Sequence, residues 1–206
     1  MLKEQIRTVK NFNEFILKEK GSEFIAKVYP VKSEQSALVE LQNIRKKYYD
    51  ATHHCFAYRI NNDIEKYSDD GEPKGTAGIR ILNAIEHFDL SDVMLVVVRY
   101  FGGTKLGVGP LGKAYYNAAV AVIEPSNIIE LSLFRTLEIT TDFSNLNHIH
   151  RLTQQYSALI IKSDFSDKAF FECLVKPLVI DKITDELTNL TNGQIKIELK
   201  NEYKYR

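Results

Sequence analysis

The sequence predicts a protein of the α+β class that is built from two domains. The chain has 206 residues, which at roughly 150 residues per domain allows one large domain or two small ones. Strand-like and helix-like segments alternate along the chain, and near residue 132 a new series of them begins. From there the order is strand, helix, strand, strand, helix, strand, which is the order of a ferredoxin-like βαββαβ domain. We therefore expect domains over residues 1–131 and 132–206.

The first domain is expected to hold three strands and three helices. Strands are expected where β-branched and aromatic residues alternate or run together, and helices where apolar residues recur every three or four positions. The expected strands are GSEFIAKVYPV (21–31), HHCFAYRI (53–60) and DVMLVVVRYF (92–101). The last of these is an apolar run typical of a strand buried on both faces. The expected helices are a segment capped by Ser33 with Leu38, Leu41, Ile44 and Tyr48 on one side, a segment over 75–88 and a segment over 111–123.

The second domain is expected to hold four strands and two helices. In chain order these are a strand at 134–142, a helix at 144–157, strands at 158–165 and 168–177, a helix at 178–190 and a strand at 194–203. A turn at Ser166-Asp167 joins the two middle strands, and Asn192-Gly193 is a stop signal for the second helix. A core built from about 70 residues is small, so this domain alone would be only marginally stable.

Composition limits the class of protein. Hydrophobic residues make up 44% of the chain and charged residues 26%, which indicates a folded chain rather than a disordered one. The 27 basic and 27 acidic side chains cancel, so any contact with nucleic acid has to come from a local basic patch. No apolar run approaches the roughly 20 residues of a membrane span, no secretory signal is visible, and Cys55 and Cys173 give no disulfide or metal framework. We expect a cytoplasmic protein with no membrane partner.

The first of three candidate site segments is the strand ATHHCFAY (51–58). Side chains alternate along a strand, so His53 and Cys55 share one face and His54 lies on the other. A Cys–His nucleophilic pair or a metal site is one interpretation. The absence of a CxxC motif, an HExxH motif or a third ligand favours the other, in which Cys55 is a small packed residue. We expect no metal ion and no cofactor.

The second segment is SDDGEPKGTAG (68–78), which has three carboxylates in four residues and glycines that permit positive φ angles. One interpretation is a turn followed by the cap of a helix. The run of small residues indicates in addition that another backbone or a ligand passes close to it. The residues of this segment taken as candidate site positions are Ser68, Asp69, Asp70, Gly71, Glu72, Gly75, Thr76 and Gly78.

The third segment is RYFGGTKLGVGPLGK (99–113), which contains five glycines, three basic side chains and no carboxylate. It lies between a buried strand and the start of a helix, where free backbone N–H groups and the helix dipole favour an anion. It is not a Walker loop, because GxxxxGK[ST] is absent. The candidate anion- or RNA-binding residues are Arg99, Tyr100, Gly102, Gly103, Lys105, Gly107, Gly109 and Lys113.

Together these three segments resemble the IMPACT/YigZ family. The sequence matches its ATHxCxAY, SDDGEPxGTAG and VVVRYFGGTKLGxG signatures in order and at suitable spacing, over most of residues 20–125. The rest of the chain is similar in element order to the C-terminal domain of bacterial members. Two positions depart from the family pattern. Arg80 replaces a frequent Pro and adds positive charge near the acidic segment, and Pro110 replaces a frequent Gly and removes one N–H that an anion would use.

The resemblance implies a fold and a general function. The first domain would be similar to the second domain of a small-subunit ribosomal protein, a βαβ fold with a left-handed crossover. The second would be similar to the ferredoxin-like domains of elongation factor G. Eukaryotic relatives regulate translation by countering the activation of a kinase that responds to amino-acid starvation. Bacterial members are proposed to bind nucleic acid or ribosomes, and some carry a label as proline dipeptidases.

The function predicted from these observations is that of a non-enzymatic regulator or binding protein of translation. Arg99, Lys105 and Lys113 would hold phosphates, and Tyr100 or Phe101 would stack on bases. The expected partner is RNA, the ribosome or a translation-related protein, and the oligomeric state is left open.

Three other interpretations stay open at the level of the sequence. An enzyme or binder acting on a small phosphorylated metabolite or nucleotide would use Asp69, Asp70 or Glu72 to hold Mg²⁺. A di-metal peptidase is disfavoured, because the five scattered histidines do not form its ligand set. An internal ion network between the acidic segment and the basic residues Arg99 and Lys105 would leave a purely structural module.

Overall fold

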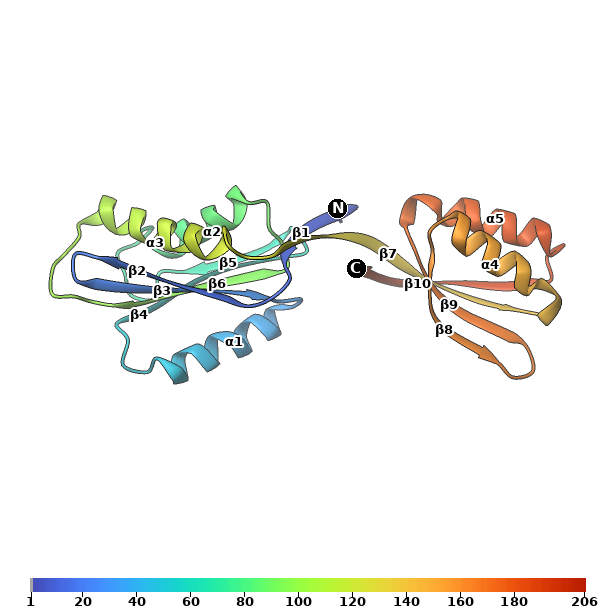
Figure 1. Cartoon of the computed structure of the whole chain (residues 1–206), viewed down its shortest axis with the longest axis horizontal. Coiled ribbons are helices and arrows are strands. Elements are labelled where there is room, and N and C mark those ends of the chain that lie inside the picture. Colours follow the sequence, from blue (N-terminus) through green and yellow to red (C-terminus); the bar gives the residue numbers. More distant parts are fainter. Residues whose placement is uncertain (1) are drawn as a thin grey trace. The chain divides into compact units, whose positions relative to one another are not determined.

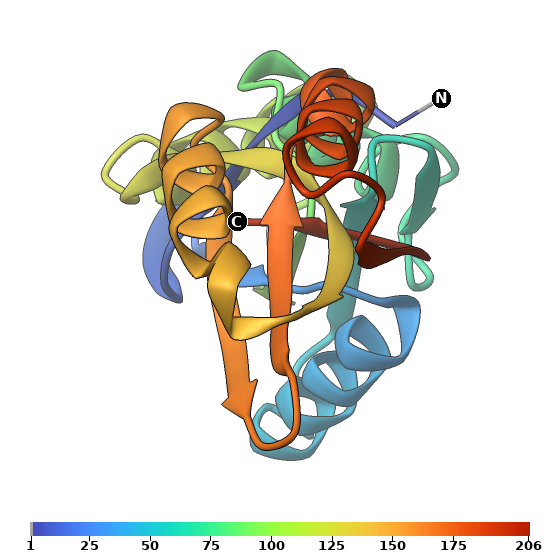
Figure 2. The same ribbon diagram turned by 90° about the vertical axis from the view of Figure 1, so that its right-hand side faces the viewer.

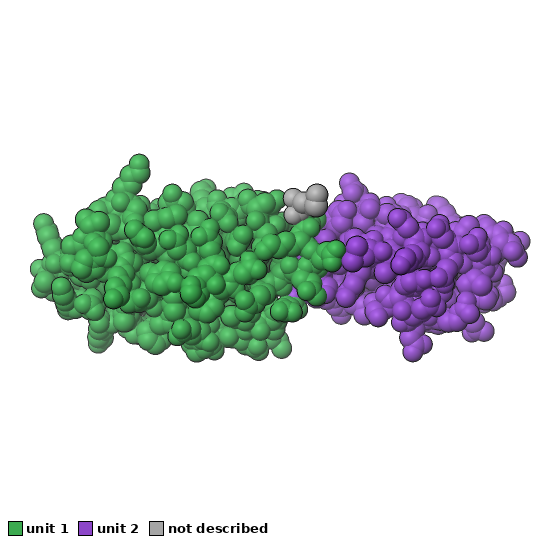
Figure 3. Space-filling model, turned by 90° about the horizontal axis from the view of Figure 1, so that it is seen from above, with its two compact units in different colours: residues 1–130 green, residues 131–206 purple. Residues whose placement is uncertain are grey.

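Two units make up the chain in the computed structural model, which describes residues 2–206. The first unit ends at Glu130 and the second begins at Leu131 (Figure 3). Each unit contains an antiparallel sheet with helices packed on it, and the described residues form five α-helices in total. The α+β class predicted from the sequence is therefore confirmed.

The first unit is centred on a five-stranded antiparallel sheet with the strand order β2-β3-β6-β4-β5. Its strands are β2 (Asn13–Glu19), β3 (Ser22–Pro30), β4 (His53–Ile60), β5 (Ile64–Ser68) and β6 (Val93–Tyr100). Strands β3 and β4 are joined through a helix, and both pair with β6, which therefore lies between them. A further strand, β1 (Gln5–Val9), precedes the sheet, and the residue after it donates its backbone N–H to the carbonyl of Asn127.

Helices cover both faces of this sheet. Helix α1 (Glu34–Lys47) lies on one face, and helices α2 (Gly78–His87) and α3 (Val108–Ile123) lie on the other (Figure 1). Successive side chains of β6 enter the two cores alternately. Val93, Leu95 and Val97 pack with α2 and α3, while Met94, Val96 and Val98 pack with α1. The expectation that this strand is buried on both faces is confirmed.

Three strands of the first unit have no counterpart in the sequence-based prediction. Strands β2 and β5 are the two edges of the sheet, and most of their side chains are exposed. An edge strand with two polar faces shows little of the alternation on which strand prediction depends. These strands, and the short β1, are therefore visible only through their pairing with neighbours.

The helices begin and end close to the expected positions, with two corrections. Ser33 caps α1 through a capping box with Ser36, as its position predicted, but Leu38 is exposed rather than part of the buried stripe. Helix α3 begins at Val108 instead of Leu111. The glycines and Pro110 had indicated a loop there, yet proline fits the first turn of a helix, where its missing N–H has no intrahelical partner to lose.

The second unit has the predicted element order of strand, helix, strand, strand, helix, strand. Its elements are most of β7 (Ile128–Thr141), which begins just before the boundary between the units, and then α4 (Leu146–Gln155), β8 (Leu159–Phe165), β9 (Ala169–Val175), α5 (Ile180–Leu190) and β10 (Ile195–Tyr205). The strand order is β10-β7-β9-β8, and all pairs are antiparallel. Helices α4 and α5 lie side by side on one face of this sheet (Figure 2) and enclose a separate core. Single 3₁₀ turns at 143–145 and 177–179 precede these helices, so both begin two residues later than predicted.

None of the helices within residues 2–206 combines the length and the apolar composition that a membrane span requires.

Candidate functional site

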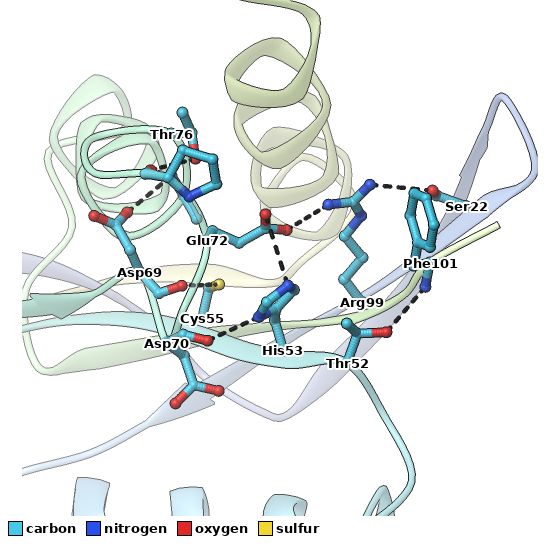
Figure 4. A network of polar contacts seen from close by, with 12 residues as sticks. Ser22, Thr52, His53, Cys55, Asp69, Asp70, Glu72, Thr76, Arg99 and Phe101 are labelled. Atoms are coloured by element: carbon cyan, nitrogen blue, oxygen red, sulfur yellow. Dashed lines mark hydrogen bonds and ion pairs between the residues drawn. The ribbon is translucent and has the colours of Figure 1, made fainter. Parts of the chain in front are cut away.

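A buried ion pair joins two of the segments that the sequence singled out. Arg99 on β6 is 5% exposed, and its Nη1 donates to Oε1 of Glu72 at 2.6 Å (Figure 4). The same carboxylate oxygen accepts a hydrogen bond from the Tyr115 hydroxyl of α3 at 2.7 Å. The attraction within a buried charge pair offsets the cost of desolvation only when further hydrogen bonds support the pair. Glu72 therefore ties the acidic segment to β6 and α3, as the structural-network interpretation anticipated for Arg99.

Aromatic rings enclose the Arg99 guanidinium. Its central carbon lies 5.3 Å from the centre of the Phe24 ring and 5.5 Å from the centre of the Phe101 ring, within the range of cation–π attraction. Nη2 donates to the Ser22 hydroxyl at 3.3 Å. The remaining nitrogen, Nε, is buried and has no hydrogen-bond partner among the described residues. Arg99 thus contacts the exposed Phe101 ring, and one of its donors has no partner within residues 2–206.

His53 and Cys55 lie on the same face of β4, as predicted, and His54 lies on the other. The carbonyl of Asp70 lies 2.8 Å from Nδ1 of His53, and Nε2 of His53 lies 3.7 Å from Glu72. On the opposite face, a ring nitrogen of His54 lies 2.9 Å from the carbonyl of Tyr48. The alternation of β4 therefore sends the two neighbouring histidines to different environments.

The Cys55 thiol is part of the buried network. It donates to the carbonyl of Asp69 at 3.0 Å and lies 3.4 Å from the Tyr115 hydroxyl. Burial is the main cause that raises the pKa of Cys55 above its ordinary value of 9.0, and burial likewise raises the pKa of Tyr115. Because the thiolate is the nucleophilic form, Cys55 is held as a packed thiol rather than as a reactive one.

The carboxylates of the acidic segment are already engaged by other groups of the chain. Asp69 accepts three backbone N–H bonds at the start of α2, from Gly75, Ala77 and Gly78, at 2.8 to 3.0 Å. Asp70 accepts from Arg45 and from the backbone N–H of His54, both at 2.7 Å.

This engagement bears on the Mg²⁺ alternative. With Glu72 bound to Arg99 and Tyr115, each of the three carboxylates proposed as Mg²⁺ ligands already has protein donors. In the part of the chain that the structure describes, no three His, Cys, Asp or Glu side chains are grouped to hold a metal ion.

Close backbone packing accounts for two of the glycines. A Cβ at Gly78 would lie 2.7 Å from backbone atoms of Ser68, and a Cβ at Gly102 would lie 1.9 Å from the carbonyl carbon of Gly21. Both distances are too short for any side chain. The small residues of the acidic segment therefore let its two ends, Ser68 and Gly78, pack against each other. Ser68 and Thr76 make short local hydrogen bonds. Gly71, Gly75, Gly103 and Gly107 have positive φ angles. Gly109 has neither feature, and a Cβ there would meet open space.

An open cleft lies beside this network, and we call it the first cleft. It has a volume of about 320 Å³. Its lining residues are Glu72, Pro73, Arg99, Phe101, Lys105, Leu106, Gly107, Val108 and Leu111. Lys105 is exposed and makes no hydrogen bond or ion pair with any described residue, so it is not part of the ion network. Helix α3 begins at this cleft, and its N-cap residue, Gly107, offers no side chain to the first N–H groups.

Two of the predicted binding residues lie elsewhere. Tyr100 follows Arg99 on β6 and therefore faces α1, where its hydroxyl donates to Asp50 at 2.8 Å; this bond raises the pKa of Tyr100 to about 12. Lys113 lies one turn into α3 and lines a separate cleft. The sequence reasoning did not include Ser22 or Tyr115, because a serine after a turn and a tyrosine in an alanine-rich helix carry no signal of a polar network.

Comparison with known proteins first defines the class of each part of the chain. Residues 20–123 match the Impact N-terminal domain, and residues 139–194 match a domain of unknown function, DUF1949. The chain is 35% identical over 193 residues to the IMPACT family member YvyE of Bacillus subtilis, covering 93% of this chain and 89% of that protein. It is 26% identical over 182 residues to YigZ of Escherichia coli, covering 86% and 89%. The chain belongs to the IMPACT family.

One further relative matches only part of this chain, and one solved structure matches nearly all of it. Protein IMPACT of Xenopus laevis is 38% identical over 98 residues, which is 44% of this chain and 31% of that protein. A solved structure described as a hypothetical protein matches 98% of this chain and 100% of its own, with a TM-score of 0.71 and 24% sequence identity. That structure shows that the fold of both units occurs in an experimentally determined protein.

Proposed function

We propose that this chain is a non-enzymatic, translation-associated binding protein that contacts RNA or the ribosome through the first cleft. The observation that carries the proposal is the meeting of three groups in one place. Three features border the same cleft: the exposed aromatic ring of Phe101, the cation of Lys105, which has no partner within residues 2–206, and the start of α3, which has no side-chain cap there. Aromatic rings stack on unpaired bases, and cations and helix starts bind phosphate. These are the groups that a single-stranded nucleotide needs.

Arg99 has a different role here from the one that its charge suggested. Its two terminal nitrogens are occupied by Glu72 and Ser22, so it is a positioning residue that holds Phe101 over the cleft. Lys105 then supplies the phosphate contact, and Phe101, rather than Tyr100, supplies the stacking surface. A small number of phosphate contacts gives modest affinity and a shallow dependence on salt.

The remaining expectations fit this proposal. We infer a cytoplasmic location and a translation-related partner, in line with the regulatory role that the family resemblance implies. The same resemblance implies a left-handed βαβ crossover in the first unit and a ferredoxin-like fold in the second. Both folds occur in components of the translation apparatus.

One observation favours a second candidate, the binding of a small phosphorylated metabolite or nucleotide. A volume of about 320 Å³ lies at the lower end of the range for small-molecule pockets. The glycines and Lys105 would then cradle the phosphate, without the Mg²⁺ ligands that the sequence suggested. Thermal shift with a panel of nucleotides tests this candidate, because a ligand at about 100 times its Kd adds about 2.7 kcal/mol to stability.

The experiment for the main proposal measures the affinity for a labelled single-stranded RNA at several salt concentrations. Lys105→Ala and Phe101→Ala should weaken binding, and Lys105→Ala should also make the logarithmic salt slope shallower by about 0.7. Lys46→Ala and Tyr49→Ala, both on the α1 side of the sheet, are the matched controls. Unchanged affinity in both cleft variants, or equal losses in the controls, would refute the proposal.

A further inference from the structure

A second cleft lies between α2 and α3, and it has a volume of about 400 Å³. Its lining residues are Arg80, Asn83, Val108, Gly109, Gly112, Lys113 and Tyr116. Arg80 and Asn83 come from α2 and the others from α3. The sequence indicated Lys113 as a phosphate contact and Arg80 as an unusual charge, but it gave no sign that the two residues border one cavity.

The charge of the second cleft is positive. Arg80 and Lys113 are both exposed, and neither side chain forms an ion pair or a hydrogen bond with another residue of 2–206. The described residues that line the cleft include no carboxylate. Two unpaired cations together with the amide of Asn83 form a set of donors suited to a phosphate group.

Gly112 explains how Arg80 reaches this cleft. A Cβ at Gly112 would lie 3.3 Å from Nε and 3.6 Å from Cγ of Arg80, so the side chain of Arg80 lies directly over this part of α3. A larger residue at position 112 would displace the side chain of Arg80 from this position. The absence of a side chain at Gly112 therefore leaves room for the cation of Arg80 beside α3.

The two clefts adjoin each other at the start of α3. Val108 lines both of them and is 68% exposed, so it forms a low apolar ridge between Lys105 on one side and the pair Arg80 and Lys113 on the other. The only carboxylate among the described lining residues of either cleft is Glu72, which Arg99 already neutralises. A ligand that carries more than one phosphate meets cations in both places.

We propose that the two clefts form one binding track for single-stranded RNA, in which Arg80 and Lys113 hold a phosphate of the same strand whose base stacks on Phe101. This inference rests on the proposed function and extends it to a second site. A strand with repeating phosphates can contact the cations of both clefts at once. One of its unpaired bases can stack on the exposed Phe101 ring in the first cleft. A duplex offers no free base to Phe101, so the track selects single strands.

The test compares three variants in the full-length protein, using fluorescence anisotropy of a labelled ten-nucleotide oligouridylate between 0.05 and 0.2 M salt. The double variant Arg80→Gln/Lys113→Gln removes the second site, Lys105→Gln removes the first, and Lys46→Gln on α1 is the charge-matched control. With a slope of about 0.7 per phosphate on single strands, loss of one phosphate contact weakens binding about fivefold at 0.1 M salt. We expect the double variant and Lys105→Gln each to show that loss, and Lys46→Gln to show none.

The possible outcomes separate the two proposals. If Lys105→Gln weakens binding and the double variant does not, the track is wrong and the first cleft stands alone. That result would leave the second cleft to another phosphorylated partner, such as a phosphopeptide. If the wild-type protein does not bind the oligonucleotide, or no cleft variant changes its affinity, both proposals fail. Equal losses in Lys46→Gln would mean diffuse attraction and would also overturn the track. The single variant Arg80→Lys keeps a positive charge at position 80. A salt slope equal to that of the wild type in this variant, and a shallower slope in the double variant, would support a charge contact at this position.

Discussion

Two charged, glycine-containing segments meet beside the first cleft, and they differ in how they use their charges. The acidic segment at 68–78 places every carboxylate against donors from the chain itself, including three N–H groups of one helix start. The basic segment at 99–113 buries Arg99 against Glu72 but leaves both of its lysines without a side-chain partner among the described residues. The carboxylates of the first segment are therefore engaged in the fold, while the lysines of the second are the cations that our proposal assigns to a ligand.

This difference teaches that charge and glycine content alone do not identify a binding site. A carboxylate whose hydrogen bonds are satisfied inside the protein has little left to offer a metal ion or substrate. A cation with no internal partner has its whole charge available. The two segments differ in whether their charged side chains have hydrogen-bond or ion-pair partners. The predictions below test this difference, from the largest expected change in stability to the smallest.

The largest loss of stability is expected for Glu72→Ala. The substitution removes the acceptor of the buried Arg99 guanidinium and of the Tyr115 hydroxyl. Breaking a buried pair by removing one partner costs about 3–5 kcal/mol, because the other charge stays buried and uncompensated. Urea denaturation followed by circular dichroism measures the change. Glu202→Ala, which breaks an exposed pair with Lys204, should change the free energy of unfolding by less than about 0.5 kcal/mol. Similar values for the two variants would show that the network contributes little.

A second test contrasts two glycines of the basic segment. Gly102→Ala would force its new methyl group against the backbone of Gly21, and the resulting shift should cost about 1–3 kcal/mol. Gly109→Ala adds a methyl group in open space at the start of α3 and should be neutral or stabilise by up to about 1 kcal/mol. Thermal unfolding of both variants checks the contrast. If both are tolerated, the turn at Gly21 and Gly102 is not as tightly packed as described.

Asp69→Ala tests the use of a carboxylate as a helix cap. The side chain accepts N–H bonds from Gly75, Ala77 and Gly78, and loss of a capping residue typically costs about 1–2 kcal/mol. Asp69→Asn, which keeps one acceptor oxygen, should lose less. Chemical denaturation of the three proteins gives the order wild type, Asn variant, Ala variant. An Asn variant less stable than the Ala variant would contradict the capping role.

Much of the fold was predictable because the central elements carry strong patterns. The unbroken apolar run at 93–98 is buried between two helical layers, and all five helices lie where apolar periodicity placed them. The edge strands β2 and β5 were missed, since their exposed residues follow no pattern that distinguishes them from loops. Local signals describe what a segment buries, but the pairing of an edge strand depends on a neighbour that is distant in the sequence.

The candidate site was predictable in its segments but only partly in its roles. The motifs identified Arg99, Lys105 and Glu72 as important, yet nothing local shows that Arg99 is buried against Glu72 while Lys105 is not. The partners that decide this, Ser22 and Tyr115, belong to other strands and helices. Residue type indicates what a side chain is able to do, and its three-dimensional partners decide what it does.

A pH test addresses the buried thiol. Since burial raises the pKa of Cys55 in the folded state above 9.0, the unfolded state loses its proton first as the pH rises. The stabilising effect is therefore complete below pH 9 and declines at higher pH. Cys55→Ala should make the decline in unfolding free energy between pH 9 and 10.5 shallower than in wild type. Buried tyrosines such as Tyr115 shift in the same direction, so part of the decline should persist. An unchanged slope would mean that Cys55 does not contribute.

Lys105→Ala is expected to change stability least and binding most. The side chain is exposed and lacks an internal partner in the described structure, so its removal should alter the free energy of unfolding by less than about 0.5 kcal/mol. The same variant should bind single-stranded RNA about fivefold more weakly at 0.1 M salt. Glu72→Ala is its counterpart, because that substitution acts on the fold. The opposite result would be a Lys105→Ala protein that unfolds more easily but keeps its affinity for RNA. In that case Lys105 would stabilise the fold, as the carboxylates of the acidic segment do, and would not bind the ligand.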